Sequence, residues 1–162
     1  MTDQQRRDRF KRIADQLEEL ITKTDDRAAH CATAIALLHH NIPRVSWTGF
    51  YFIKDGDLVV DAKQAQVACL VLERKVGVCW AAIDSDQTQI FRDVHAFPGH
   101  IPCDDRSRSE VVVPIHDADG RPIGVLDIDS HKEGHFDDLD GEGYEMVVTL
   151  LENRWNKGSS GA

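Results

Sequence analysis

The hydrophobic periodicity of the chain changes partway along the sequence, and this change limits the possible folds more than any other feature. Between Thr2 and Thr24 apolar side chains recur every three or four residues, which is typical of an amphipathic helix. A second helical pattern begins at Asp25–Asp26. From Val45 the apolar residues form short β-rich runs, and helical spacing returns after Asp137, a predicted N-cap. Helices are therefore expected to flank a central region of strands.

The central region contains several runs that are rich in β-branched and aromatic residues. They lie at 45–54, 58–62, 89–91, 111–115 and 122–128, with a further apolar run at 68–72 and a short helix beginning at 77–82. The turns at 55–57 and 117–121 join neighbouring runs, which indicates hairpins and antiparallel pairing. We therefore predict an α+β fold, in which N- and C-terminal helices cover one face of a central, mostly antiparallel β-sheet.

Size and charge limit the function classes. The 162 residues suffice for one domain with a hydrophobic core, predicted over residues 1–157, and residues 158–162 have the composition of a flexible tail. The net charge of −9, from 28 acidic and 19 basic residues, argues against a nucleic-acid partner. No apolar run is long enough to span a membrane and the charged N-terminus has no signal pattern, so we expect a cytoplasmic protein without a membrane partner.

Three cysteines, Cys69, Cys79 and Cys103, lie in the central segment. Structural disulfides are uncommon in the cytosol, so this grouping indicates redox chemistry, metal binding or chance burial. Cys103 precedes a loop with two aspartates and two arginines at 104–108; the arginines would stabilise a thiolate, whereas the aspartates would oppose it. The fourth cysteine, Cys31, falls on the apolar face of the second helix and is expected to be a core residue.

Three carboxylates are candidates for acid chemistry or for binding a cation. Glu110 precedes the apolar run 111–113, so it is either a buried acid with a raised pKa or a solvated residue at a strand end. Asp127 and Asp129 flank Ile128 in a predicted strand, which directs both carboxylates to the same face. Such a pair could bind an ammonium group, coordinate a metal or share a proton, or it could simply face solvent.

Two aromatic residues, Trp47 and Tyr51, share one face of the first predicted strand. Beside carboxylates, this pair could hold an apolar or sulfur-containing group next to a cation. Ordinary core packing is the simpler interpretation of the pattern alone.

A zinc site is a further interpretation of the cysteine loop. His95, His100 and Cys103 have the spacing H-x4-H-x2-C, and zinc accepts nitrogen and sulfur ligands. The loop itself contains no CxxC or HxxxH pair, and the Pro98–Gly99 turn makes convergence of the three side chains uncertain, so the pattern favours this site only weakly.

Taken together, these motifs resemble those of the free methionine-(R)-sulfoxide reductases, a catalytic branch of the GAF-domain fold. The matching segments are WTGFY at 47–51, Ala-Cys at 68–69, GVC at 77–79, DVHAFPGHI at 93–101, Cys-Asp at 103–104, Ser-Glu at 109–110, VVP at 112–114, IGVLDIDS at 123–130 and Phe-Asp at 136–137. The intervals between the three cysteines, 10 residues from 69 to 79 and 24 residues from 79 to 103, match as well. The chain departs from the family pattern at 61–66, at Trp80 and at Asp105–Arg106.

The resemblance implies a GAF-like fold and the reduction of free L-methionine-(R)-sulfoxide. By position, Cys103 would attack the sulfoxide, Cys69 would form a disulfide with it, and Cys79 would be a further thiol able to join the exchange. No metal or organic cofactor is implied, because an external dithiol such as thioredoxin would supply the electrons. A homodimer is expected on the same ground.

The resemblance also assigns the substrate pocket. Trp47 and Tyr51 would hold the methionine side chain, while Glu110, Asp127 and Asp129 would bind its amino group and supply the catalytic acid. The alternative function is a non-catalytic GAF module that senses a small molecule, because the fold alone does not determine activity.

Overall fold

An antiparallel sheet of six strands forms the centre of the structure, a computed structural model that describes residues 1–100 and 103–158. In these residues the strands follow the order β3-β2-β1-β6-β5-β4 across the sheet. Their bounds are β1 Trp47–Lys54, β2 Asp57–Ala65, β3 Val71–Leu72, β4 Gln89–Phe91, β5 Ser109–His116 and β6 Pro122–Ser130. Every pair of neighbours is antiparallel, as the hairpin signals predict.

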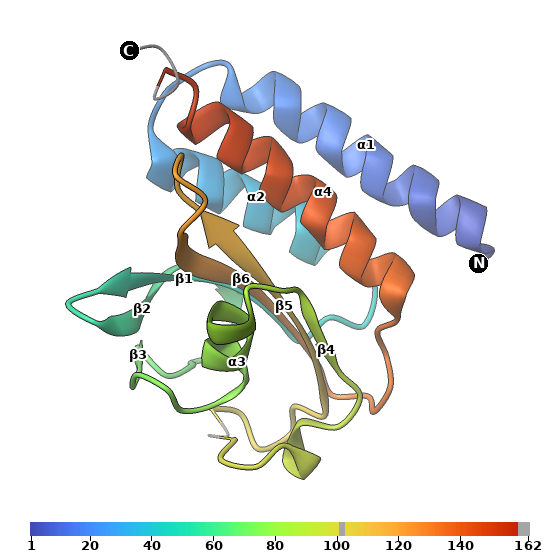
Figure 1. Cartoon of the computed structure of the whole chain (residues 1–162). Helices are drawn as coiled ribbons and strands as arrows, with labels where there is room; N and C mark the ends of the chain where they lie inside the picture. Colours follow the sequence, from blue (N-terminus) through green and yellow to red (C-terminus); the bar gives the residue numbers. More distant parts are fainter. Residues whose placement is uncertain (101–102, 159–162) are drawn as a thin grey trace.

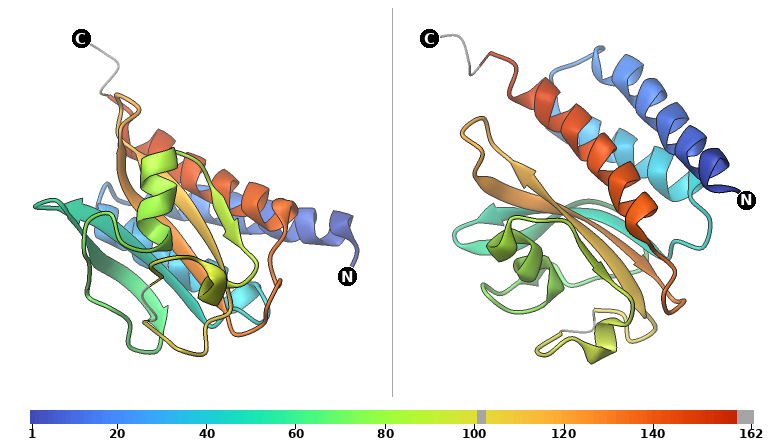
Figure 2. Two further views of the ribbon diagram at one scale, coloured as in Figure 1. Left: turned by 60° about the horizontal axis from the view of Figure 1, so that its bottom comes forward. Right: turned by 45° about the vertical axis from the view of Figure 1, so that its right-hand side comes forward.

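Three long helices cover one face of this sheet, and a short helix lies on the other face (Figures 1 and 2). The long helices are α1 Asp3–Ile21, α2 Arg27–Asn41 and α4 Asp138–Trp155; the short helix is α3 Val78–Ser85, and η1 Val94–Ala96 is a single 3-10 turn. Thr2, Asp26 and Asp137 accept backbone N–H bonds at the starts of the long helices, which confirms Asp137 as an N-cap. The α+β class and the helical cover are therefore confirmed.

Alternation along the central strands divides the interior into two cores. Val111 of β5 and Ile128 of β6 face the long helices and pack with their apolar sides. Val112 of β5 and Val125 of β6 face the other way, toward α3. Cys31 lies on the buried face of α2 and is completely buried, which confirms it as a core residue. The α3 side of the sheet is the one on which the candidate site lies.

The ends of the chain add little to this picture. The predicted tail, residues 158–162, lies outside the described residues except for Gly158. Within the described residues, none of the helices combines the length and the apolar character needed to cross a membrane.

Candidate functional site

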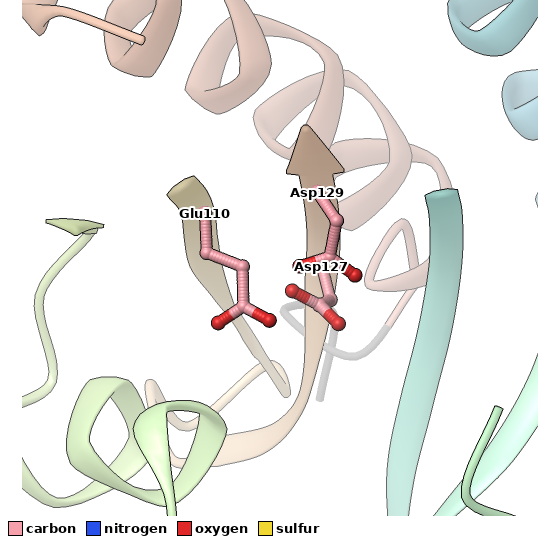
Figure 3. A group of neighbouring side chains, drawn as sticks. All are labelled: Glu110, Asp127 and Asp129. Carbon is pink, nitrogen blue, oxygen red and sulfur yellow. The ribbon is translucent and has the colours of Figure 1, made fainter. Parts of the chain in front are cut away.

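The pairing of β1, β5 and β6 brings three carboxylates together. Glu110 lies directly opposite Asp129 across β5 and β6, and Asp129 lies opposite Trp47 across β6 and β1. Residues directly opposite one another project to the same face, and Asp127 joins them because it is two residues from Asp129. One carboxylate oxygen from each of the three acids lies within 4.8 Å of the other two (Figure 3). We call these three residues the acid triad.

Burial controls the charge of the acid triad. One oxygen each of Glu110, Asp127 and Asp129 is enclosed and has no hydrogen-bond partner in the described part of the chain. Burial, together with the charge of Asp127, raises the pKa of Glu110 to about 8, although contact with Asp129 opposes the rise. Burial and neighbouring carboxylates also raise the pKa of both aspartates well above the usual range. The unliganded site therefore retains protons near neutral pH, and a bound cation would favour its charged form.

Two aromatic side chains of β1 form a wall beside the acid triad. Trp47 and Tyr51 are both buried and project to the same face as the acids, with Gly49 between them. Gly49 makes room for the indole, because a Cβ at this position would lie 2.7 Å from Cζ2 of Trp47. A group of carboxyls, whose charged form a bound cation would favour, thus lies next to an apolar, polarisable surface, and this combination suits a small molecule with a cationic end and an apolar end.

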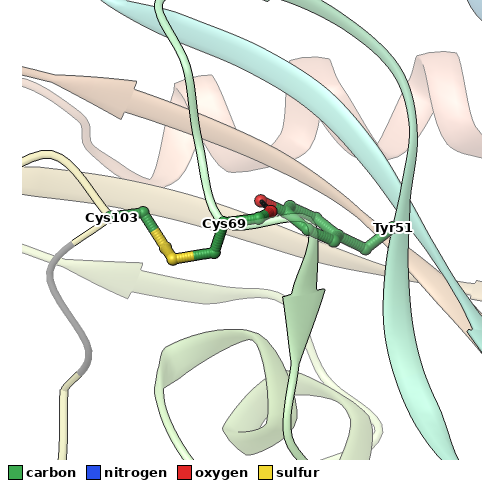
Figure 4. The surroundings of a disulfide bond; sticks show 3 residues. All are labelled: Tyr51, Cys69 and Cys103. Carbon is green, nitrogen blue, oxygen red and sulfur yellow. Dashed lines mark hydrogen bonds between the residues drawn. A yellow bond between two sulfur atoms is a disulfide. The ribbon is translucent and has the colours of Figure 1, made fainter.

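Cys69 and Cys103 are joined by a disulfide at the mouth of the site (Figure 4). The two Cα atoms are 5.3 Å apart although 34 residues separate them in sequence, and both side chains are half-buried. The hydroxyl of Tyr51 donates a hydrogen bond of 3.1 Å to the carbonyl oxygen of Cys69. The aromatic wall therefore contacts the segment that carries one of the two bonded cysteines. The pairing of these two cysteines is the one that the resemblance implies.

A small cavity of about 40 Å³ lies between the disulfide and the acid triad. Its lining consists of Trp47, Tyr51, Ala68, Leu72, Val76, Gly77, Val78, Cys79, His100, Cys103, Asp104, Ser107, Glu110, Asp127 and Asp129. This volume accommodates only a few water molecules, since a buried water needs roughly 10–15 Å³. The disulfide form therefore has a preformed but nearly closed site.

Cys79 is buried at the base of the cavity, close to the acid triad. Burial, followed by the charges of Asp127, Glu110 and Asp129, raises its pKa well above the ordinary value of a thiol. In this conformation Cys79 is therefore held as a neutral thiol, which disfavours a role as nucleophile.

The residues that depart from the family pattern have clear places in the structure. Trp80 is a buried residue of α3, and its indole N–H donates a 3.0 Å hydrogen bond to the carbonyl of Leu72. Arg106 binds Asp104 at 3.0 Å and also donates to the side chain of Gln66. Through Gln66 it links the loop after Cys103 to the segment before Cys69. Trp80, Gln66 and Arg106 therefore make contacts that support the cysteine-bearing segments.

The weak zinc interpretation is not supported by the geometry. Cys103 is bonded to Cys69, so its sulfur is not a thiolate ligand here, and the rings of His95 and His100 have centroids 6.2 Å apart in an edge-to-face arrangement. Within residues 1–100 and 103–158, the acid triad is the group whose possible metal-ligand atoms converge. Carboxylate oxygens suit hard cations and ammonium groups rather than a zinc site built from nitrogen and sulfur.

The structure brings together the residues singled out on β1, β5 and β6, and it corrects the simpler interpretations of three of them. Glu110 is not a solvated strand end, and Asp127 and Asp129 do not face solvent, because α3 and the cysteine-bearing segments cover that face of the sheet. Sequence reasoning missed the apolar lining at Leu72 and Val78. Their only signal is the general hydrophobicity of their runs, which does not distinguish a pocket wall from core.

The stability of the unliganded protein is expected to fall as the pH rises from about 4.5 to about 8. In this interval buried Glu110 keeps its proton in the folded state, whereas the same group in the unfolded chain loses it. The folded state then binds more protons, so the free energy of unfolding decreases with pH, by up to about 1.4 kcal/mol per pH unit from this residue. Urea titrations between about pH 5 and about pH 7 measure the slope.

The Glu110→Gln variant should show a shallower slope, because it removes one of the buried acids whose pKa is raised. Glu145→Gln, which changes an exposed glutamate of α4, is the matched control and should keep the wild-type slope. An identical slope in wild type and Glu110→Gln would contradict the raised pKa.

Comparison with known proteins adds independent findings. The chain matches the GAF-domain family over residues 8–152. It is 44% identical over 145 residues to Protein YtsP of Bacillus subtilis, covering 88% of each chain. It is 41% identical over 124 residues to the free methionine-R-sulfoxide reductase of Escherichia coli, covering 76% of this chain and 74% of that protein. A solved structure of free methionine-R-sulfoxide reductase from Neisseria meningitidis, in complex with its substrate, is similar with a TM-score of 0.87 and 33% identity over 94% of this chain and 92% of the other.

Proposed function

The chain belongs to the GAF-domain family and, within it, to the free methionine-R-sulfoxide reductases, and on this premise we propose that it reduces free L-methionine-(R)-sulfoxide to L-methionine. The proposal extends to a mechanism in which Cys103 is the nucleophile and Cys69 closes a disulfide. Thioredoxin or a similar dithiol then returns both cysteines to thiols.

The observation that carries the proposal is the acid triad beside the aromatic wall. A free amino acid has an α-ammonium group, with three N–H donors and a positive charge, whereas a methionine residue within a peptide lacks this group. The enclosed oxygens of Glu110, Asp127 and Asp129 are acceptors in need of such a donor. The faces of Trp47 and Tyr51 suit the sulfur-containing side chain. Together these features favour the free amino acid over a peptide-bound residue.

In the first step, the thiolate of reduced Cys103 attacks the sulfoxide sulfur. Glu110 is protonated below its pKa of about 8, so it can give a proton to the sulfoxide oxygen at neutral pH. That oxygen passes to Cys103 as a sulfenic acid, the substrate sulfur gains two electrons, and methionine leaves. One of the aspartates could deliver the proton in place of Glu110, because their pKa values are raised as well.

In the second step, the thiolate of Cys69 attacks the sulfenic sulfur, a disulfide forms, and the displaced hydroxyl takes up a proton and leaves as water. The Cα separation of 5.3 Å between Cys69 and Cys103 supports this step, since disulfides require such a distance. The hydrogen bond from Tyr51 to the Cys69 carbonyl would hold the segment in place. An external dithiol then reduces the disulfide and prepares the next cycle.

A turnover assay with dithiothreitol as reductant tests the proposed function. Free L-methionine-(R)-sulfoxide, the S epimer and a peptide-bound methionine sulfoxide are supplied separately, and methionine formation is measured for each. Consumption of the free R epimer alone is the expected result. If none of the three is consumed, the site is that of a sensor module and the proposal fails; reduction of the peptide-bound form would refute the role assigned to the acid triad.

A further inference from the structure

The segment around Cys69 exposes an unusual amount of apolar surface. Val67, Leu70 and Val71 are 85%, 66% and 49% exposed, respectively, and they lie within five consecutive residues. We call these three side chains the Cys69 flank. Elsewhere in the described chain, the large hydrophobic residues with comparable exposure are Met1, Leu20 and Met146, which lie at the N-terminus, in α1 and in α4. The exposed apolar surface is therefore concentrated beside the disulfide.

The backbone of this segment is anchored, so its side chains are presented on a fixed support. The amide of Val60 in β2 donates a 2.9 Å bond to the carbonyl of Leu70, and Tyr51 donates to the carbonyl of Cys69. In β3, at the edge of the sheet, Leu72 points inward and Val71 points outward. Clustered apolar side chains that are held outward in this way are typical of a surface that another protein covers.

We propose that the Cys69 flank is the docking surface for a protein dithiol reductant of the Cys-X-X-Cys type, whose thiolate attacks Sγ of Cys69. This inference rests on the proposed function, in which the disulfide of Cys69 with Cys103 must be reduced after each turnover. The occupant is identified by chemistry, because only a partner that brings a thiolate to this disulfide can complete the cycle. An apolar surface around the partner's own thiols would complement the flank.

Local charge favours attack at the sulfur of Cys69 over that of Cys103. In a chain of net charge −9, the segment 62–76 has three exposed basic residues, Lys63, Arg74 and Lys75, and one acid, Glu73. The loop after Cys103 has no such excess, because its two aspartates and two arginines at 104–108 balance in charge and Asp104 is paired with Arg106. An approaching thiolate, or an acidic partner, is therefore attracted more strongly to the Cys69 side.

The exchange balances in two steps. The partner's first thiolate forms a disulfide with Cys69 and breaks the bond to Cys103, which leaves as a thiolate. The partner's second thiol, after losing its proton, then attacks the first partner sulfur and closes the partner's own disulfide. Cys69 leaves as a thiolate and takes up a proton. Two electrons pass from the partner's dithiol to this protein, and the released Cys103 thiolate is ready for the next sulfoxide.

The test compares Leu70→Asp and Val67→Asp with the wild type, using reduced thioredoxin as the probe. The rate at which thioredoxin reduces the preformed disulfide is measured by thiol titration, without any sulfoxide, so the result does not depend on the substrate. Each variant should lower kcat/KM for thioredoxin by about tenfold or more, while reduction by dithiothreitol stays at the wild-type rate. Met146→Asp, which changes a 45% exposed hydrophobic residue on α4, should leave both rates unchanged.

The attacked sulfur is identified with a thioredoxin whose second cysteine is replaced by serine. The trapped mixed disulfide is expected on Cys69, and peptide mass mapping locates it; trapping on Cys103 would overturn the assignment. Unchanged thioredoxin kinetics in both flank variants would overturn the docking surface, and a change only in oligomeric state would identify the flank as a contact between copies of this chain. Failure of the proposed function shows differently, as absence of sulfoxide turnover in wild type with dithiothreitol.

Discussion

Replacement of Cys103 by serine is expected to abolish turnover of free methionine sulfoxide, lowering kcat by about 1,000-fold or more. A serine hydroxyl keeps the shape of the side chain but is not ionised near neutral pH, so no nucleophile remains to accept the sulfoxide oxygen. Cys69→Ser should behave differently. It retains the attacking thiol, so it should form about one equivalent of methionine per protein without added reductant, and the Cys103 sulfenic acid should then accumulate.

Rapid-quench measurement of methionine, with mass detection of the trapped sulfenic acid, distinguishes the two variants. Cys31→Ala is the matched control, because it removes a cysteine buried beneath the helices, away from the site. It should keep wild-type turnover despite some loss of stability. Full activity in Cys103→Ser would refute the assignment of the nucleophile, whereas repeated turnover in Cys69→Ser with thioredoxin as reductant would refute the resolving role of Cys69.

The second large effect is expected from Asp127→Asn. This change keeps the shape of the side chain but removes the charge that would face the substrate ammonium, and losing one partner of a buried charge pair costs about 2–5 kcal/mol. The value of kcat/KM should therefore fall by about 30-fold to several thousand-fold. Asp119→Asn, which changes an exposed turn, should have no effect.

An analogue of methionine sulfoxide without the amino group separates binding from general damage. Wild type should turn it over poorly, and Asp127→Asn should lower that poor rate little further, because the interaction it removes is already absent. If the variant loses as much activity with the analogue as with the amino acid, Asp127 does not bind the ammonium group.

The placement of the acids shows what the sequence could predict. Asp127 and Asp129 flank a single residue in a strand, so period-two alternation alone directs them to one face. Whether that face is exposed to solvent or buried depends on α3 and on the two cysteine-bearing segments, which lie far from these aspartates in sequence. Burial, and with it the raised pKa of Glu110, is therefore a property of long-range packing that local pattern cannot supply.

The disulfide, too, could be predicted from the sequence only in part. The spacing of the cysteines matched a family, yet no local signal brings Cys69 within bonding distance of Cys103. Their approach depends on β3 at one edge of the sheet, on the loop that precedes β5, and on the contact between Arg106 and Gln66. Helix boundaries are easier to predict from sequence, because caps such as Asp26 and Asp137 form hydrogen bonds with residues close to them in the chain.

The small volume of the cavity under the disulfide has a kinetic consequence. Ligand pockets usually enclose several hundred cubic ångströms, whereas this one holds about 40 Å³ while Cys69 and Cys103 are bonded. We therefore expect the disulfide form to exclude both methionine and a second sulfoxide, and the site to open on reduction. In the proposed cycle, reductant and sulfoxide would then alternate without a ternary complex. Such an enzyme would follow ping-pong kinetics, with parallel double-reciprocal plots, and its rate would be limited by whichever of the two substrates is lower relative to its own KM.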